Sequence, residues 1–359
     1  MTTTNTGLHG PTILKTKHNI VLDATLLSAL MSCARFTDLR FNNNLQGIKG
    51  KSNSLEVGSV VHKGLEVAYK LMMFGHSRQN AVQTGLIAAQ MYADGCPHCA
   101  GFTDRDCEDC NGNGNVPAPD MTDEMISLRP CEFCKGTGKI NKPACGHSAD
   151  EYPGVINSPQ ESEGYLVGVS HAIHTLEEYF DYYKNDHWVT LGVETVEGKI
   201  LYEDDDIRIL WKAKLDWKVD TNQGIFPCDH KTSKQRRQKI KLNNQFMGQC
   251  LVMGTRSMIV NEIGFQKSLK PSEKFLRPIM SYTSDALLEW QGTTLPYWAY
   301  KLVDYQETGY WPPNLTHCEN KYGNCPFIHA CEADPQRREE ELRINFIKGP
   351  DWNPTNEDE

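Results

Sequence analysis

An acid and a lysine stand two positions apart at the end of a short apolar run. The run is GIFPCDHKT, in which Asp229 and Lys231 flank His230. Side chains alternate along a strand, so Asp229 and Lys231 share one face and His230 points to the other. Six basic residues lie between Lys231 and Lys241 with no acid among them, although the net charge of the chain is −9. What this pair can do chemically depends on the strand beside it.

The preceding strand supplies a second carboxylate. The segment DTNQG predicts a hairpin turn, and centring it on Asn222 and Gln223 places Asp216 directly opposite Asp229. Two facing carboxylates repel each other, and a divalent cation between them reverses that effect. Oxygen ligands suit Mg²⁺ or Mn²⁺ better than zinc. Such an ion beside a phosphodiester can activate water, while Lys231 stabilises the charge that develops on the phosphate.

A surface hairpin with solvated acids would produce the same pattern. A three-residue turn would also shift the register by one and take Asp216 and Asp229 out of opposition. The hairpin alone therefore leaves a phosphodiester site and a solvated surface both open. In the first case, phosphates of a nucleic-acid backbone would be contacted by the downstream cations Lys234, Arg236, Arg237, Lys239 and Lys241.

Three helices, then three strands and a further helix are expected around these residues. Periodicity and capping predict helices over 20–42 (capped at Asp23 or Thr25), 55–74, 161–185 and about 243–255, and strands over 188–198, 206–220 and 224–232. The 359 residues suffice for one large domain or two ordinary ones, and 39% hydrophobic with 23% charged residues is typical of a globular protein. No apolar run approaches the roughly 18–20 residues of a membrane span. The N-terminus lacks the apolar core of a signal peptide, which predicts a cytoplasmic protein without a membrane partner.

Together, AKLD and PCDHKTSK resemble the PD-(D/E)XK nuclease superfamily, specifically its RecB-like branch. The resemblance implies an α/β fold whose core is a mixed β-sheet flanked by helices. It also implies that His62, in VGSVVHKGLE, completes a metal site with Asp216 and Asp229, and that Lys231 is catalytic. Gln245, in QFMGQ, would help to position substrate or metal.

Two further positions bear on this resemblance. Gln249 stands where the family often has tyrosine, which departs from the pattern on the helix and leaves the metal ligands intact. Glu194, in GVETVEG, lies in a strand where relatives often carry an acid, and we interpret it as a structural or minor contributor.

Thirteen cysteines indicate bound metal, because a reducing cytosol disfavours disulfides. Cys318, Cys325 and Cys331 form a late group, and Cys33 is the isolated candidate for a fourth ligand. Four thiolates can hold a [4Fe–4S] cluster. The arrangement resembles the iron–sulfur subgroup of RecB-like nucleases, which includes the CRISPR-adaptation and AddB-type enzymes, where the cluster pins the two chain ends around the nuclease fold. Zinc at the same four ligands stays open as the alternative.

A second cysteine-rich segment, 94–150, has too few large apolar residues for a core of its own. Its CxxC units, two of which resemble the CxxCxGxG units of DnaJ-type zinc domains, offer eight ligands: Cys96, Cys99, Cys107, Cys110, Cys131, Cys134, Cys145 and His147. Eight ligands make two tetrahedral zinc sites, which can supply the folding energy of a small module. His98 is a rival ligand at the outer site. We expect a zinc-binding insertion that grips DNA or a partner protein.

These patterns predict four parts. They are 1–93, the N-terminal helical part of the nuclease domain; 94–150, the zinc-binding insertion; 151–348, the nuclease core with the late cysteines; and 349–359, a loose tail. The function that the resemblance implies is Mg²⁺- or Mn²⁺-dependent hydrolysis of DNA, as an exonuclease acting on ends or single strands in recombination, repair or phage DNA processing. The setting would be a bacterial or phage-infected cytoplasm, with a helicase or recombination protein as a possible partner. The alternatives are a non-catalytic nucleic-acid clamp and a DnaJ-like protein-interaction module.

Overall fold

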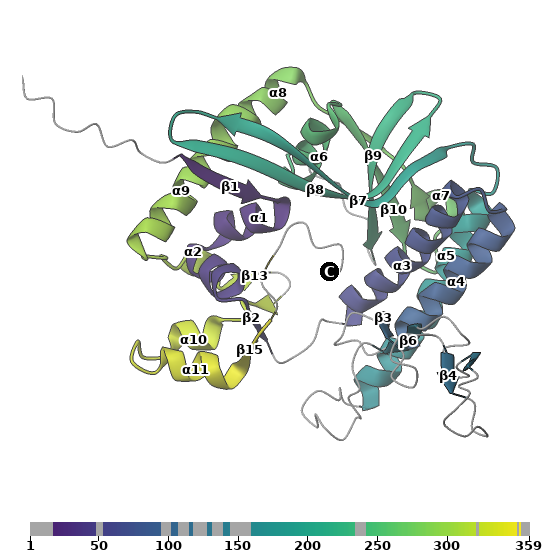
Figure 1. The fold of residues 1–359 in the computed structure, drawn as a ribbon, viewed down its shortest axis with the longest axis horizontal. Helices are drawn as coiled ribbons and strands as arrows, with labels where there is room; N and C mark the ends of the chain where they lie inside the picture. Colours follow the sequence, from purple (N-terminus) through teal and green to yellow (C-terminus); the bar gives the residue numbers. More distant parts are fainter. Residues whose placement is uncertain are drawn as a thin grey trace, which may run out of the picture.

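The structure is a computed structural model that describes residues 17–47, 53–94, 159–233, 242–320, 323–349 and 352, with four short strands between 102 and 143. The fold is α/β, as the sequence predicts: a seven-stranded mixed sheet is flanked by helices (Figure 1). Within the described parts of the chain, none of the helices is long and apolar enough to cross a membrane.

Strand β8 (Ile207–Thr221) is the central strand of the sheet. Along one edge it pairs antiparallel with β7 (Val189–Glu203). Along the other edge its first residues, 207–211, pair in parallel with β1 (His18–Leu22), and its last, 217–221, pair antiparallel with β9 (Gly224–Ser233). Residues 212–216 thus fall between two ladders, at a fork where β1 gives way to β9.

The sheet continues beyond β9. Strand β10 (Ser257–Gly264) runs parallel to β9, and it pairs antiparallel with the short strands β11 (Phe275–Leu276) and β12 (Ile279–Ser281). The parallel β9–β10 pair is joined by a crossover through α6 (Asn244–Met253).

Two hydrophobic cores flank the sheet, and β8 contributes to both. The first core packs α1 (Ala24–Ser32), α6, α8 (Ser284–Glu289) and α9 (Leu295–Thr308) around the first part of β8. The second packs α3 (Asn53–Met73), α4 (Arg78–Asp94) and α5 (Pro159–Tyr182) around its end, as the two helix groups in Figure 1 show. Alternate residues of β8 are buried, from Ile207 to Val219, which is the two-residue period of a strand that covers a core.

The single helix predicted over 20–42 is wrong at its start and in its continuity. Residues 18–22 form β1, because Ile20 and Leu22 are buried against β8 while Val21 between them is exposed. Helix α1 begins as expected at Asp23, whose carboxylate accepts a hydrogen bond from the Leu26 amide at 2.7 Å. It ends at Cys33, which is extended, and the chain resumes as α2 (Ala34–Thr37) and a π-helical turn (Asp38–Asn42).

The remaining elements are short. In the C-terminal part they are α7 (Pro271–Lys274), the helical turns Trp290–Thr294 and Leu315–His317, β13 (Glu319–Asn320), β14 (Gly323–Asn324), α10 (Ile328–Glu332), α11 (Arg338–Asn345) and β15 (Phe346–Lys348). Strand β15 pairs with β2 (Leu45–Gly47), which ties the C-terminal part to the N-terminal part. Within 94–150, β3 (Phe102–Asp106) pairs with β6 (Lys139–Pro143), and β4 (Asn115–Pro117) pairs with β5 (Leu128–Pro130).

Candidate metal sites

The β8–β9 hairpin has the predicted register. Pairing runs from Thr221 opposite Gly224 to Trp217 opposite Cys228. Asp216 and Asp229 are the next positions in this register, but the ladder ends one pair short of them. Instead, the amide of His230 donates a hydrogen bond of 2.7 Å to Asp216 Oδ2. The backbone of β9 therefore fixes the Asp216 carboxylate at the point where the two strands part.

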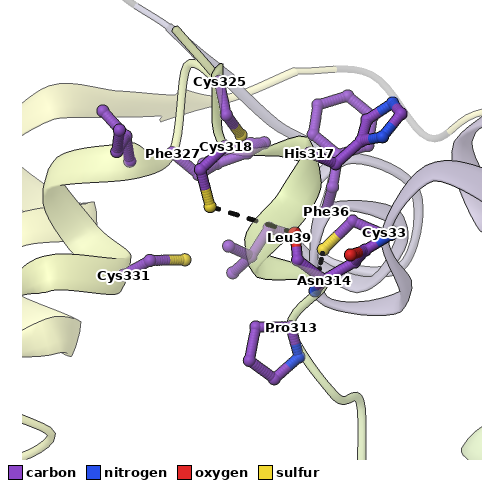
Figure 2. A pocket seen from close by; sticks show the side chains of 11 residues that line it. Cys33, Phe36, Leu39, Pro313, Asn314, His317, Cys318, Cys325, Phe327 and Cys331 are labelled. Atoms are coloured by element: carbon purple, nitrogen blue, oxygen red, sulfur yellow. Dashed lines mark hydrogen bonds between the residues drawn. The ribbon is translucent and has the colours of Figure 1, made fainter. Parts of the chain in front are cut away.

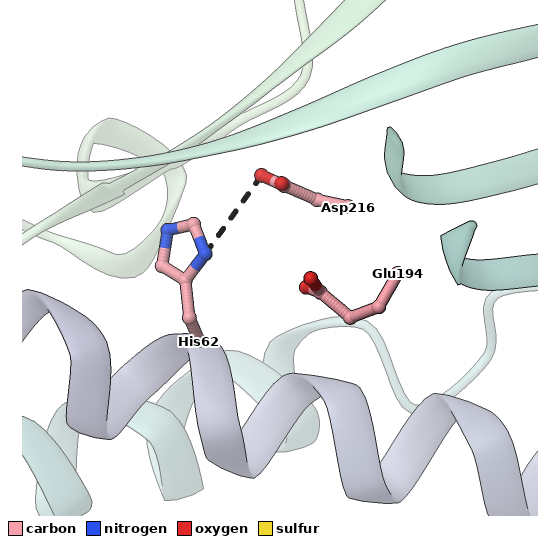
Figure 3. Close-up of side chains that lie close together, drawn as sticks. All are labelled: His62, Glu194 and Asp216. Atoms are coloured by element: carbon pink, nitrogen blue, oxygen red, sulfur yellow. Dashed lines mark ion pairs between the residues drawn. The ribbon is translucent and has the colours of Figure 1, made fainter. Parts of the chain in front are cut away.

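Three potential metal ligands meet at this fork: His62 from α3, Glu194 from β7 and Asp216 from β8 (Figure 3). One ligand atom from each side chain lies within 4.8 Å of the other two, and His62 Nδ1 is 3.8 Å from Asp216 Oδ2. Two carboxylates and one imidazole can hold a divalent cation such as Mn²⁺ or Mg²⁺. The donor set thus fits the predicted ion; it includes Glu194, and the predicted ligand Asp229 lies outside this group of three.

Glu194 is the ligand that sequence reasoning underrated. The β7–β8 ladder pairs Val193 with Trp217 and Thr195 with Leu215, so Glu194 stands opposite Asp216. Counting back from the turn would instead pair Glu194 with Trp217, because an irregularity between Ile200 and Tyr202 shifts the register by one. A carboxylate in the middle of a strand was the signal in the sequence that pointed to Glu194. The residue opposite it on β8, however, could not be derived by counting from the turn.

The backbone at Glu194 is itself unusual. Its φ of 53° lies in the left-handed region, which is uncommon for any residue other than glycine. Conformations of this kind cluster at functional sites, where the surrounding structure holds them in place. Here Lys214 Nζ lies 3.0 Å from Glu194 Oε2 and helps to fix the side chain.

Asp229, Lys231 and Gln245 form a closed group beside these ligands. Asp229 is 1% exposed; its Oδ2 lies 2.8 Å from Lys231 Nζ, and its Oδ1 accepts a hydrogen bond of 2.7 Å from Gln245 Nε2. Gln245 Oε1 in turn accepts from Lys231 Nζ at 3.3 Å. The Lys231 side chain is 36% exposed, so its ammonium can contact a bound molecule while Asp229 and Gln245 hold it on the protein side.

Burial and crowding of negative charge set the electrostatics of the fork. Burial, followed by the charges of Asp229 and Glu194, raises the pKa of Asp216 well above its ordinary value. Burial also lowers the pKa of His62, which favours the neutral imidazole that can bind a metal. A cation placed among these groups would offset the repulsion between the carboxylates.

Two contacts position helix α6 at the fork. A Cβ on Gly248 would lie 2.3 Å from Trp211 Nε1, so only glycine permits this approach to β8. Gln249 Nε2 donates to the carbonyl of Lys214 at 3.1 Å, which satisfies a backbone group of β8 between its two ladders. The Asn243 side chain caps the helix by accepting from the amides at its start, and Gln245 in the first turn thereby reaches Asp229.

The four cysteines predicted to bind a cluster line one pocket: Cys33, Cys318, Cys325 and Cys331 (Figure 2). Asn314 joins the two chain regions that supply them. Its amide donates to Cys33 Sγ at 3.3 Å, and its side chain donates to the carbonyl of Ser32 at 2.8 Å. Phe327 extends the assembly by stacking on Phe346 of β15, with ring centroids 4.6 Å apart.

The spacing of these sulfur atoms bears on what they could hold. Across the described residues, the one group of three ligand atoms lying within 4.8 Å of one another is that at the fork, so no three of these thiols are so close. A single zinc with Zn–S bonds of about 2.3 Å would place its sulfurs about 3.8 Å apart. Three of these thiols would therefore have to move closer together to bind one zinc ion. Burial and the neighbouring thiols raise the pKa of Cys318 and Cys325, so a positively charged centre would be needed to favour the thiolates.

Other predicted residues have different outcomes. Cys228 and Cys250 belong to neither cysteine group and are fully buried. Outside the described residues lie the eight predicted zinc ligands of the insertion and the five predicted DNA-binding cations at 234–241.

The similarities of this chain to known proteins are slight. No family model matches the chain, and no curated protein matches it. One solved structure, described as "Crystal structure of SSO0001", aligns with 13% sequence identity over 40% of this chain and 66% of that chain, with a TM-score of 0.23. A similarity of this size does not support an inference about fold or function.

Proposed function

We propose that the protein is a metal-dependent DNA nuclease of the RecB-like PD-(D/E)XK type. The observation that carries the proposal is the fork between β8 and β9. Here His62, Glu194 and Asp216 converge within reach of one ion, and Lys231 is held beside them by Asp229 and Gln245. Both halves of the motif named from the sequence, the carboxylates and the lysine, occur together at one place in the fold.

A divalent Mg²⁺ or Mn²⁺ ion, held by His62, Glu194 and Asp216, would activate water and neutralise charge on a phosphodiester. The remaining work falls to Asp229, Gln245 and Lys231. Asp229 and Gln245 fix the Lys231 ammonium, so that it is oriented before any substrate arrives. Lys231 can then donate to a phosphate oxygen whose negative charge increases in the transition state. The His230 amide keeps the Asp216 carboxylate in place.

The substrate class rests on the resemblance and on charge. The cations from Lys234 to Lys241 follow β9 directly in the sequence, and we propose that they bind phosphates of the substrate backbone. We propose DNA with a free end or a single-stranded region as the substrate, and exonuclease action in recombination, repair or phage DNA processing. A helicase or recombination protein would be the partner, in a bacterial or phage-infected cytoplasm.

The cysteines are proposed to serve as structural staples. A [4Fe–4S] cluster on Cys33, Cys318, Cys325 and Cys331 would join α1 to the C-terminal part, where Asn314 already links them. Two zinc ions would organise the 94–150 insertion, which we propose contacts DNA or the partner. The insertion adds to the nuclease core without changing the order of its motifs.

The test is cleavage of end-labelled single- and double-stranded DNA by protein purified without oxygen, with and without Mn²⁺. Lys231→Ala is expected to reduce cleavage by about 100- to 1,000-fold, the usual cost of removing one group that stabilises transition-state charge. Lys218→Ala is the matched control, because Lys218 belongs to the same hairpin and contacts Glu197 instead. Product lengths distinguish exonuclease from endonuclease. Wild-type protein that binds DNA and Mn²⁺ but leaves the DNA whole would make the protein a clamp and refute the proposal.

A further inference from the structure

A buried cation lies behind the fork. Arg277, in the chain between β11 and β12, has a side chain that is only 6% exposed, and it forms an ion pair with Asp186. Its guanidinium lies 3.6 Å from the centre of the Tyr183 ring and 4.4 Å from that of Trp188. Arginine in such an aromatic enclosure is held by both stacking and charge.

Arg277 reaches β9 through Asn261. Arg277 Nε donates to Asn261 Oδ1 at 3.4 Å, while Asn261 Nδ2 donates to Tyr179 Oη at 2.9 Å and to His230 Nδ1 at 2.8 Å. Asn261 also pairs with His230 in the parallel β10–β9 ladder. The guanidinium, which can only donate, fixes which way the Asn261 amide faces. The amide, as a donor, then makes His230 Nδ1 an acceptor and assigns the ring proton to Nε2.

His230 in turn adjoins two of the three ligands at the fork. Its amide donates to Asp216 Oδ2 at 2.7 Å, and its ring meets that of His62 edge to face, with centroids 5.7 Å apart. The His230 ring is 2% exposed and stacks near Tyr69 and Trp217. A ring that is packed on its faces and hydrogen-bonded at Nδ1 fixes the torsions of residue 230, including the direction of its amide.

We propose that Arg277 is a positioning residue for the metal centre, acting through Asn261 and His230 on Asp216 and His62. The proposal rests on the proposed function only in taking the fork to bind a divalent cation. Nε2 of His230 is buried without a hydrogen-bond partner among the described residues, so the bond from Asn261 at Nδ1 is what orients the ring. Partners that orient metal ligands typically change metal affinity about 10- to 100-fold when removed. The sequence gives no hint of this role, because Arg277 is 61 residues from Asp216 and belongs to no motif.

A second ion pair in the same region provides the control for a purely structural role. Lys274 Nζ lies 2.6 Å from Glu178 Oε2, and the Lys274 side chain is 5% exposed. This pair links α5 to α7, whereas the Arg277 pair links the loop after α5 to the loop between β11 and β12. In the hydrogen bonds of the described residues, however, Lys274 and Glu178 do not contact Asn261 or His230. Removing either ion pair should lower the stability of the protein, but only removal of the Arg277–Asp186 pair should weaken metal binding at the fork.

The experiment measures Mn²⁺ binding by calorimetry without DNA, so that it does not depend on cleavage. The first variant combines Arg277→Gln with Asp186→Asn, which avoids leaving one buried charge alone. The second is Asn261→Leu, and the control combines Lys274→Met with Glu178→Gln. The first two variants are expected to bind Mn²⁺ about 10- to 100-fold more weakly, while the control binds it as the wild type does. Folded variants with unchanged Mn²⁺ affinity, or an equal loss in the control, would overturn the proposal.

A spectroscopic measurement keeps the test decisive if the large substitutions prevent folding. In ¹⁵N-histidine-labelled protein, His230 should carry its proton on Nε2. Asn261→Asp keeps the size of the side chain and its attraction to Arg277 but offers His230 only an acceptor, so the proton should move to Nδ1. An unchanged tautomer would show that Asn261 does not orient His230 and would refute the proposal. Wild-type protein that binds no Mn²⁺ would refute this proposal and the nuclease together, whereas Mn²⁺ binding without cleavage would refute the nuclease alone.

Discussion

The fork and the cysteine pocket are built in opposite ways. At the fork, the ligands come from long elements, and contacts of the chain itself already fix them: Asp216 by the His230 amide, and Glu194 by Lys214. In the cysteine pocket, the ligands come from the end of α1 and from short C-terminal segments. There Asn314 links the two chain regions by hydrogen bonds, and Phe36 packs against Phe327.

This difference indicates two roles for bound inorganic groups. The residues of the fork are held in place by the protein without an ion, so an ion there can bind and dissociate during turnover. The pocket is formed by short segments that lie far apart in the sequence and meet through a few contacts such as that of Phe36 with Phe327, so the group that it holds would be part of the structural frame. We therefore expect metal loss to affect activity at the first place and folding at the second, and the following variants test that contrast.

The largest effect is expected for Cys331→Ala. Metal binding at structural sites contributes about 10 kcal/mol or more to folding in model peptides, so losing one ligand should release the bound group and lower the melting temperature sharply. Iron content, visible absorbance and thermal unfolding measure this. Cys250→Ala is the control: it removes a buried thiol from the first core and should cost only about 1 kcal/mol while iron stays bound. Full iron content in Cys331→Ala would show that Cys331 is not a ligand of the iron.

Asp216→Asn should separate binding from stability. Mn²⁺ affinity is expected to fall by more than about 100-fold, beyond the loss typical of residues that only orient ligands. Without metal, the variant should be as stable as the wild type or more stable, because burial, Asp229 and Glu194 oppose ionisation of Asp216. Its pKa is raised in the folded state, so the metal-free wild type should lose stability as the pH rises through that pKa, and the variant should not. Calorimetry and thermal unfolding in chelator check both points; a marked loss of metal-free stability would contradict them.

Gly248→Ala should disturb the fork from the α6 side. The added Cβ would meet Trp211 Nε1 at 2.3 Å, and overpacking of this kind costs about 1–3 kcal/mol. The displaced helix should also carry Gln245 away from Asp229 and reduce cleavage. Gly292→Ala is the matched control, since a Cβ there has no described atom within 4 Å. Equal behaviour of the two variants in urea unfolding would show that α6 is not seated on glycine.

The smallest effect compares Glu194→Gly with Glu194→Ala. Both remove the carboxylate and should weaken Mn²⁺ binding equally. Glycine adopts the left-handed conformation freely, so its variant should be more stable than the alanine variant by about 1 kcal/mol. Urea unfolding measures the difference. An alanine variant as stable as the glycine variant would mean that the backbone at 194 stores no strain.

Sequence reasoning succeeded where structure is local. The tight turn after β8 fixed the hairpin register, and the alternating and helical periods gave the α/β class and most of the helices. The place of Glu194 could not be counted, because a β-bulge separates it from the nearest turn. Asn261 could not be assigned either, since its contact with His230 depends on a parallel pairing between strands joined through α6. Long-range pairings of this kind leave no periodic signal in the chain.

The sharing of β8 between both cores has a consequence for how the protein unfolds. A single continuous strand cannot leave one core and stay ordered in the other, so the two helical groups should melt in one cooperative transition. The amides at the centre of β8 should accordingly exchange with solvent only through global opening, and thus set the upper limit of protection for the whole chain. Loosening α1 at its cysteine end would then lower the protection of amides beside Asp216, which makes hydrogen exchange a means to detect one site from the other.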